Sequence, residues 1–313
     1  MLRCTLKVLI LNHQHVACGV YQFAKRIYTI ASRSTKIEYL HISVSNRQQY
    51  IMALERFAPD FIIYNWHWDR MPWLLESDIT QNKKTKHYFI YHDGSVFKQY
   101  DKYLFFGDFD PDKKDCAPNK SFLLPRPLID YNGMYCKNEI PTIGSFGFGF
   151  NIKNFHLIVK LVNDTFDSAV VNLHMTRAYF GDLPGNKLLD IVNLCKNNNT
   201  NPNIKLNIST NFLSDEELLV FLASNDINIF YYQHDMKNPG ISSAIDYALS
   251  VKRPIAITNN IMFRHMMSDG IILEKNSIQD IINNNTIPLH KYYDLWSTDN
   301  FSRQLDNLFL GNL

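Results

Sequence analysis

The sequence predicts an α/β protein made of two doubly wound units, each with its own parallel sheet. Stretches with the apolar pattern of strands alternate with stretches of helical spacing; this alternation stops near residue 125 and starts again near residue 142. The chain has 313 residues, of which 46% are hydrophobic, and this exceeds what one hydrophobic core commonly supports. We therefore expect an N-terminal domain at residues 1–138 and a C-terminal domain at residues 139–289, with the tail at about 290–313 packed back on the body.

The N-terminal domain opens with an apolar strand at 7–12, a loop that ends at Gly19, and a run of helical spacing. Further elements are expected as strands at 37–44, 60–65, 87–91 and 103–106 and as a helix at 47–57. Sheet regularity is expected to end where Pro125 and Pro127 stiffen the chain. We place the link between the domains between Pro127 and Pro141.

The C-terminal domain restarts with a strand at 142–146, a glycine-bearing loop and a helix with one apolar face. Further strands are expected at 169–174, 204–208, 227–230 and 254–258. Residues 214–217 read Ser-Asp-Glu-Glu, which is the pattern of a capping box that opens a helix. The tail from residue 290 is rich in aromatic and aliphatic residues, so it is too apolar for a free terminus.

The composition excludes some classes of partner. There are 32 Lys and Arg residues against 30 Asp and Glu residues, without the basic footprint that nucleic acid requires. The five cysteines are scattered, which suits reduced thiols and hence a cytoplasmic protein. No apolar run approaches the roughly 20 residues of a membrane span.

Residues 238–246 form the strongest candidate for a binding element. Pro239-Gly240 precedes a predicted helix in which Ser242 and Asp246, four positions apart, project together. A helix N-terminus offers unpaired N–H groups to a diphosphate, and a carboxylate one turn later can accept hydrogen bonds from ribose hydroxyls. The alternative is a plain helix start that a serine caps.

The surrounding run, 212–259, resembles the C-terminal domain of family-4-type retaining glycosyltransferases of the GT-B fold. The matching segments are 214–218 (the acidic helix start), 226–230 (a strand), 238–246 (the E-x7-E segment) and 253–258 (the strand that follows it). The likeness spans about residues 7–258. It implies two Rossmann-like, doubly wound parallel-sheet domains that face a central cleft.

The resemblance also implies roles for residues of the C-terminal domain. Asp246 matches the glutamate that binds the donor ribose, and Asn238 matches the catalytic glutamate, without its charge; His234 and Asp235 lie close by and could compensate. Lys153 matches the lysine on the donor diphosphate. Arg177 is a candidate to replace the family's arginine, whose place Phe148 takes. The donor-binding set is Gly19, Lys153, Arg177, Gly240, Ile241, Ser242, Ser243 and Asp246.

In the N-terminal domain, Gly19 matches part of the glycine loop after the first strand. His92 follows a strand at the place where the family has a histidine that contacts the transferring sugar, so we expect it to be catalytic. Tyr21, Gln22 and Asp93 are expected on the acceptor side.

Two further patterns suggest metal sites without fitting one. Asp108-Phe109-Asp110 is a D-x-D of the kind that holds a divalent cation, but it lies in a charged segment and is expected to be a solvated loop. The histidines and the thiol expected near one another (His13, His15, Cys18 and His67) match no familiar zinc spacing. We expect no metal and no cofactor.

The resemblance therefore predicts a glycosyltransferase of polysaccharide biosynthesis. It would move a sugar from a nucleoside-diphosphate sugar to a hydroxyl of a glycan or glycolipid, with retention of configuration, in the cytoplasm or at the inner face of a membrane. The alternatives are a degenerate GT-B protein that binds a nucleotide or glycan without turnover, and a GT-B sugar-nucleotide epimerase or hydrolase.

Overall fold

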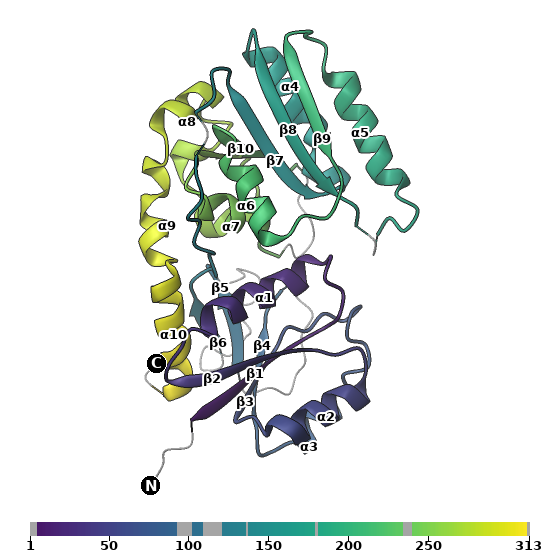
Figure 1. Cartoon of the computed structure of the whole chain (residues 1–313), viewed down its shortest axis with the longest axis vertical. Coiled ribbons are helices and arrows are strands. Elements are labelled where there is room, and N and C mark those ends of the chain that lie inside the picture. Colours follow the sequence, from purple (N-terminus) through teal and green to yellow (C-terminus); the bar gives the residue numbers. More distant parts are fainter. Residues whose placement is uncertain are drawn as a thin grey trace. The chain divides into compact units, whose positions relative to one another are not determined.

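The computed structural model describes residues 5–92, 102–108, 121–135, 137–178, 181–233 and 240–311. The chain divides into two compact units (Figure 1). The first unit comprises Met1–Ile129 and Asp294–Leu313, and the second comprises Asp130–Tyr293. Each unit holds one parallel sheet, so the predicted pair of doubly wound α/β sheets is confirmed.

The first unit contains a six-stranded sheet in the order β2-β1-β3-β4-β5-β6. Its strands are β1 (Leu6–Asn12), β2 (Ile37–Ser43), β3 (Phe61–Tyr64), β4 (Lys86–Ile90), β5 (Lys102–Phe106) and β6 (Ser121–Leu124). All neighbouring strands pair in parallel. The sequence did not predict β6, because Pro125 and Pro127 indicated an end to the sheet; the prolines instead follow the strand and stop it at Leu124.

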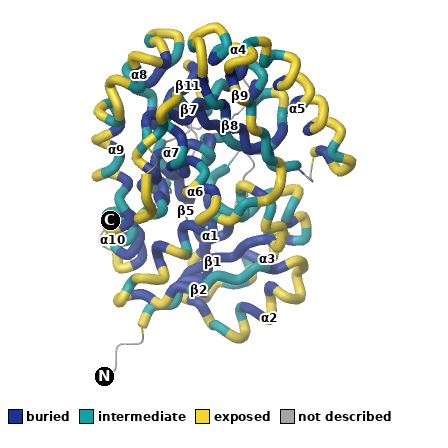
Figure 2. Tube along the Cα trace, turned by 45° about the horizontal axis from the view of Figure 1, so that its top comes forward, coloured by how far each residue is buried: buried dark blue, intermediate teal, exposed yellow. Residues whose placement is uncertain are grey.

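Helices cover both faces of this sheet (Figure 1). They are α1 (Gly19–Ala31), α2 (Arg47–Phe57), α3 (Glu76–Gln81) and α10 (Thr298–Leu310). Because successive strand residues point to opposite faces, Val8 and Ile10 join the core with α1 and α10, whereas Leu9 and Leu11 join the core with α2 and α3. Figure 2 shows these strands buried, in dark blue, under the more exposed outer side of α2.

Helix α10 is anchored to the first unit by a buried carboxylate. Asp306 accepts hydrogen bonds from the hydroxyls of Tyr39 at 3.0 Å and Ser34 at 2.7 Å. Burial, and then the charge of Asp306, raise the pKa of the Tyr39 hydroxyl, so it stays protonated and donates. Phe309 packs its ring against Phe61 at 5.0 Å between centroids. The end of the chain therefore completes the core of the first unit.

The second unit contains a five-stranded sheet in the order β11-β10-β7-β8-β9. Its strands are β7 (Thr142–Phe148), β8 (Ala169–Thr176), β9 (Ile204–Ser209), β10 (Ile227–Phe230) and β11 (Ile255–Ile257). Residues 130–138 go with this unit, since the side-chain amide of Asn138 donates to Ser224 O at 3.0 Å and to Asp226 Oδ1 at 3.1 Å.

Helices lie on both faces of the second sheet as well. The elements of this unit are α4 (Phe155–Thr165), α5 (Asn186–Asn198), α6 (Asp215–Ala223), α7 (Ala244–Ser250), α8 (Ile278–Asn284) and α9 (His290–Leu295), with the 3-10 helices η3 (Asn151–Lys153), η4 (Ile261–Met266), η5 (Asp269–Ile271) and η6 (Ile287–Leu289). Helices α4, α5 and α8 share one core with the strands. On the opposite face, α6 packs against α7.

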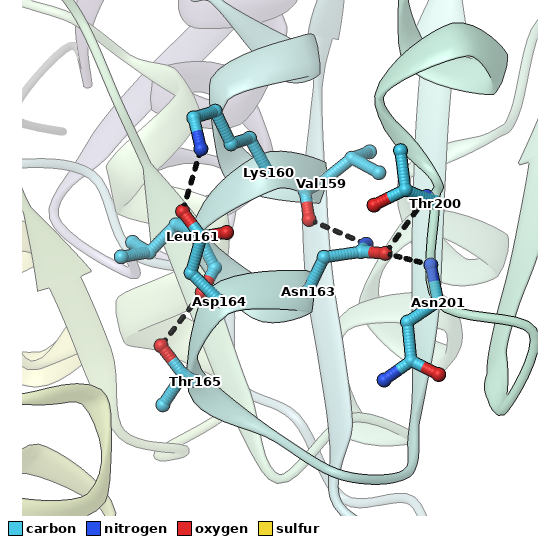
Figure 3. A network of polar contacts seen from close by, with 8 residues as sticks. All are labelled: Val159, Lys160, Leu161, Asn163, Asp164, Thr165, Thr200 and Asn201. Carbon is cyan, nitrogen blue, oxygen red and sulfur yellow. Dashed lines mark hydrogen bonds and ion pairs between the residues drawn. The ribbon is translucent and has the colours of Figure 1, made fainter.

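Asn163 in α4 joins this helix to the segment that leads into β9 (Figure 3). Its side-chain oxygen accepts from the backbone N–H groups of Thr200 at 3.0 Å and Asn201 at 2.8 Å. Its side-chain nitrogen donates to Val159 O at 2.8 Å. One short amide therefore satisfies two backbone donors that have no strand partner of their own at this bend.

The predicted capping box at the start of α6 is confirmed. Ser214 Oγ accepts from Glu217 N at 3.2 Å, and Glu217 Oε2 accepts from Ser214 N at 2.7 Å. We expect Ser214→Ala to lower the free energy of unfolding by about 1 kcal/mol, because a helix N–H loses its acceptor. Urea unfolding measures this loss. Ser268→Ala is the matched control, since Ser268 occupies the N-cap of η5 without a side-chain cap hydrogen bond; equal losses in the two variants would contradict the expectation.

His174 in β8 is a buried neutral imidazole. Nδ1 lies 2.8 Å from Ser209 Oγ and Nε2 lies 3.1 Å from Thr176 Oγ1, and burial lowers its pKa from 6.5 to about 4. The unfolded chain takes up this proton below pH 6.5, whereas the folded chain does so only near pH 4. The folding free energy that His174 contributes is therefore present above pH 6.5 and is lost as the pH falls toward 4.

We accordingly expect His174→Gln to flatten the dependence of unfolding free energy on pH between 6.5 and 4. Urea unfolding at a series of pH values gives this slope. His290→Gln, at an exposed position, should keep the wild-type slope. A slope unchanged in His174→Gln would show that His174 is not buried in its neutral form.

Candidate functional site

Each sheet reverses its direction of growth at one pair of strands. In the first unit β2 lies on one side of β1 and β3 lies on the other; in the second unit β8 lies on one side of β7 and β10 lies on the other. Open α/β sheets bind ligands outside the carboxyl ends of the strands at such switch points. The candidate sites are therefore the ends of β1 and β3 in the first unit and the ends of β7 and β10 in the second.

A polar cluster lies at the switch point of the second unit. Lys153, in η3 after β7, donates from Nζ to the hydroxyl of Tyr232, which follows β10, and Nζ lies 3.8 Å from the centroid of the tyrosine ring. The hydroxyl of Tyr232 lies 3.1 Å from Ser242 Oγ. Tyr232 and Ser242 are buried, and Lys153 is half-buried. An ammonium group and two hydroxyls together suit an anionic ligand.

Local backbone conformation places Lys153 in this cluster. Gly147, near the end of β7, has φ of +153°, a conformation that L side chains rarely adopt, and a Cβ there would lie 3.7 Å from Lys153 Cε. Asn154 has φ of +47°, ends η3 and leads directly into α4. The turn from β7 into α4 thereby brings the lysine back to the end of β10.

The predicted helix start at Gly240 is wrong. Helix α7 begins at Ala244, and Ser243 occupies its N-cap without a side-chain cap hydrogen bond. Ser242 N donates to Met262 O at 3.0 Å, which ties this residue to η4 and keeps it out of the helix. The Ser242 amide is therefore engaged inside the protein, and Ser242 joins the cluster through its hydroxyl.

Asp246 lies in the first turn of α7 and is fully buried. Its Oδ1 lies 3.9 Å from Nε2 of His265, whose side chain is also fully buried, so a protonated His265 would form an ion pair with it. The prediction that Ser242 and Asp246 share one helical turn is wrong, because Ser242 precedes the helix. The ribose-binding role of Asp246 stays a prediction.

Hydrogen-bonded side chains also mark the switch point of the first unit. Asn65, directly after β3, donates from Nδ2 to Asn12 Oδ1 at the end of β1 and to Val20 O, both at 2.8 Å. His92 Nε2, two residues beyond β4, lies 2.7 Å from Asn65 Oδ1. Asn12 Nδ2 donates to Tyr21 O at 3.1 Å. The predicted residues His92 and Tyr21 are thus joined through two asparagines.

Comparison with known proteins follows from this arrangement. No protein-family model matches the chain, and no curated protein matches its sequence. Solved structures do match: Anabaena Alr3699/HepE in complex with UDP has a TM-score of 0.66 and 10% identity over 98% of this chain and 100% of its own. A glycosyltransferase from Rickettsia africae ESF-5 has a TM-score of 0.67 and 12% identity over 99% and 100%. Sucrose-phosphate synthase from Thermosynechococcus elongatus has a TM-score of 0.67 and 10% identity over 98% and 99%. The chain has the GT-B glycosyltransferase fold.

The GT-B fold was predicted from the order of motifs, and it is confirmed. The residues that the motifs singled out are placed unevenly. Lys153 and Ser242 meet at one cluster, and Gly19, Tyr21 and Gln22 occupy the first turn of α1. Gln22 holds this turn to the preceding loop through Nε2, which donates to Val16 O at 2.6 Å.

Other predicted residues lie apart or beyond the description. Arg177 follows β8, the neighbour of β7, and a Cβ at Gly185 would lie 3.3 Å from its Cδ. Gly240 and Ile241 precede the helix start. The predictions that fall outside the described residues are those for Asp93, Phe109, Asp110, His234, Asp235, Asn238 and Pro239.

Three site residues were missed: Asn12, Asn65 and Tyr232. Each stands at or directly after the end of an apolar strand that borders a switch point of the GT-B sheets. That position was a usable signal, since the last polar residue of a parallel strand faces the site edge. Without the sheet order, nothing distinguished these strand ends from the others.

The histidines near β1 form no metal site. His13 is buried, and burial followed by the charges of His15, Arg70 and His67 lowers its pKa to about 4. Within the described parts of the chain, no three His, Cys, Asp or Glu side chains gather closely enough to hold a metal ion. The same described residues include no helix with the length and apolar character to cross a bilayer.

Proposed function

We propose that this protein is a glycosyltransferase that moves a sugar from a nucleoside-diphosphate sugar to a hydroxyl of a glycan or a lipid-linked glycan. The observation that carries the proposal is the cluster of Lys153, Tyr232 and Ser242 at the switch point of the second unit. Structural neighbours support it: one structure of Anabaena Alr3699/HepE contains UDP and glucose, and one of a trehalose-6-phosphate enzyme from E. coli contains UDP-2-fluoro glucose.

The cluster suits the diphosphate of the donor. The Lys153 ammonium would neutralise charge that develops on the diphosphate as the glycosidic bond breaks, and the hydroxyls of Tyr232 and Ser242 would donate to its oxygens. The groups are preorganised, because Tyr232 is held from behind by Thr258 Oγ1, which donates to Tyr232 O at 2.6 Å. Stabilisation of the leaving group would supply much of the catalysis.

The remaining roles follow the resemblance. Asp246 would accept hydrogen bonds from the ribose hydroxyls, with Arg177 as a second cation near the donor. His92 and Asn238 would contact the transferring sugar, and Gly19, Tyr21, Gln22 and Asp93 would line the acceptor site. We propose retention of the anomeric configuration and a reaction without a metal, in which Lys153 provides the positive charge at the leaving group.

A second candidate is a binding protein that does not turn over its ligand. It is favoured by Asn238 and Phe148, which stand where the family has a glutamate and an arginine. The donor cluster would then bind a nucleotide without a charged group opposite the sugar. A sugar-nucleotide epimerase or hydrolase is the third candidate.

Incubation with UDP-, GDP- and ADP-sugars separates these candidates. A thermal shift with one donor, followed by nucleoside diphosphate release that depends on an added hydroxyl acceptor, is the result expected of a transferase. NMR of the product then gives the anomeric configuration. Binding without release favours the binding protein, release without an acceptor favours a hydrolase, and a changed sugar on the recovered nucleotide favours an epimerase. Failure of all three donors to bind would contradict the proposal.

A further inference from the structure

We propose that Asn65 is a positioning residue, which together with Asn12 holds His92 as the Nε2–H tautomer, so that Nδ1 is the ring nitrogen that meets the transferring sugar. The proposal deepens the proposed function and rests on it for the identity of the substrate. Asn12 and Asn65 are both fully buried. All the contacts that carry the proposal lie within the first unit.

Backbone groups fix the orientation of Asn12. The backbone N–H of His13 donates to Asn12 Oδ1 at 3.0 Å, and only an oxygen can accept there. The other amide atom of Asn12 is therefore the nitrogen, and it donates to the carbonyl of Tyr21 at 3.1 Å. It also lies 3.2 Å from Nε2 of His41, which must then be the unprotonated nitrogen of that ring.

The same reasoning fixes Asn65. Its Nδ2 lies 2.8 Å from the carbonyl of Val20, which can only accept, and 2.8 Å from Asn12 Oδ1, which the His13 amide has already identified as oxygen. The atom of Asn65 that faces His92 is consequently Oδ1, an acceptor without a hydrogen.

This leaves one arrangement for the imidazole of His92 when it is neutral. Nε2 lies 2.7 Å from Asn65 Oδ1, so Nε2 carries the hydrogen and Nδ1 carries the lone pair. The ring is also held from the side by Phe23, whose ring lies edge-on at 5.7 Å between centroids. Burial of the asparagine pair strengthens the restraint, because a rotated amide would leave several buried groups without partners.

The tautomer decides what His92 can do to a sugar. With a lone pair on Nδ1, the neutral ring accepts a hydrogen bond from a sugar hydroxyl and does not donate one to the diphosphate. Asn12 extends the same restraint to the first turn of α1, since it also binds the carbonyl of Tyr21. The amide pair would thus place the sugar-contacting ring and the predicted acceptor side in one fixed geometry.

The test is a long-range 1H–15N NMR spectrum of the full chain with 15N-labelled histidine, recorded without substrate at a pH where His92 is neutral. His92→Ala assigns the signals. We expect wild-type His92 to have a protonated Nε2 and a bare Nδ1, and Asn65→Leu to show both tautomers. Tyr50→Phe is the matched control: it removes a buried 2.8 Å hydrogen bond to Tyr64 in the same unit and should leave the His92 signals unchanged.

A protonated Nδ1 in the wild-type protein would overturn the proposal. An unchanged tautomer in a folded Asn65→Leu would overturn it too. If Asn65→Leu fails to fold, the wild-type spectrum still decides. Kinetics give a second readout: kcat should fall by about 10- to 100-fold in Asn65→Leu, with KM for the donor little changed, as expected for a misplaced ring.

The two proposals fail in different ways. A chain that shows the expected tautomer but transfers no sugar contradicts the glycosyltransferase function and leaves the positioning of His92 standing. A chain that transfers sugar at the wild-type rate in Asn65→Leu contradicts the positioning role alone.

Discussion

Lys153→Ala is expected to weaken the binding of a nucleoside diphosphate by about 10- to 100-fold, which corresponds to about 1.5–3 kcal/mol for a charge-assisted hydrogen bond. The physical reason is that Lys153 supplies the ammonium of the cluster at the end of β7 and β10. Tyr232 and Ser242 remain and keep some affinity through their hydroxyls. Isothermal titration calorimetry with the nucleotide that gives the largest thermal shift measures the change.

Lys160→Ala is the matched control for this variant. Lys160 is an exposed lysine of α4 that pairs with Asp164 at 2.7 Å on the surface, one turn of helix beyond the site loop. Its removal should leave nucleotide affinity unchanged. Equal affinities for Lys153→Ala, Lys160→Ala and the wild-type protein would show that the diphosphate does not bind at this cluster.

Gly144→Ala is expected to have the largest effect on stability, a loss of about 3 kcal/mol or more. A Cβ at Gly144 would lie 1.9 Å from Asn225 Nδ2 and 2.6 Å from Asn228 Oδ1. Both asparagines are fully buried. They belong to a chain of amides that crosses the sheet, in which Asn225 accepts from Asn172 at 2.9 Å and donates to Asn228 at 3.0 Å.

The added methyl group cannot be accommodated without breaking this amide chain. Asn225 also donates to Phe221 O at 3.0 Å, so its displacement leaves several buried polar groups without partners. Urea unfolding measures the loss. Gly181→Ala is the control, because a Cβ there would lie 3.2 Å from one ring atom of Phe150 at an exposed turn. Similar losses in the two variants would mean that Asn225 moves aside at little cost.

The sequence allowed the fold to be predicted because its hydrophobic pattern is regular. Strands such as β1 and β7 are apolar runs of the expected length, and the helices between them keep one apolar face. Strand β6 escaped prediction because its two prolines look like the end of a sheet. They do end it, but only after four more residues have paired with β5.

The site was less accessible to sequence reasoning, because long-range contacts decide it. The start of α7 depends on the hydrogen bond from Ser242 to Met262, which are twenty residues apart in the chain. The amide pair Asn12 and Asn65 lies at the ends of β1 and β3, and only the sheet order makes these strands neighbours. Neither asparagine carries a charge or a motif. Lys153 was found because its place in a family pattern was visible in the sequence.

A crystal structure of the protein with its preferred nucleoside diphosphate tests the central claim most directly. We predict a diphosphate within hydrogen-bond distance of Lys153 Nζ and Ser242 Oγ, outside the carboxyl ends of β7 and β10. At a nucleotide concentration one hundred times Kd, binding should stabilise the protein by about 2.7 kcal/mol, which makes the complex easy to select by thermal shift. A nucleotide bound elsewhere on the chain, or no nucleotide at all, would contradict the account.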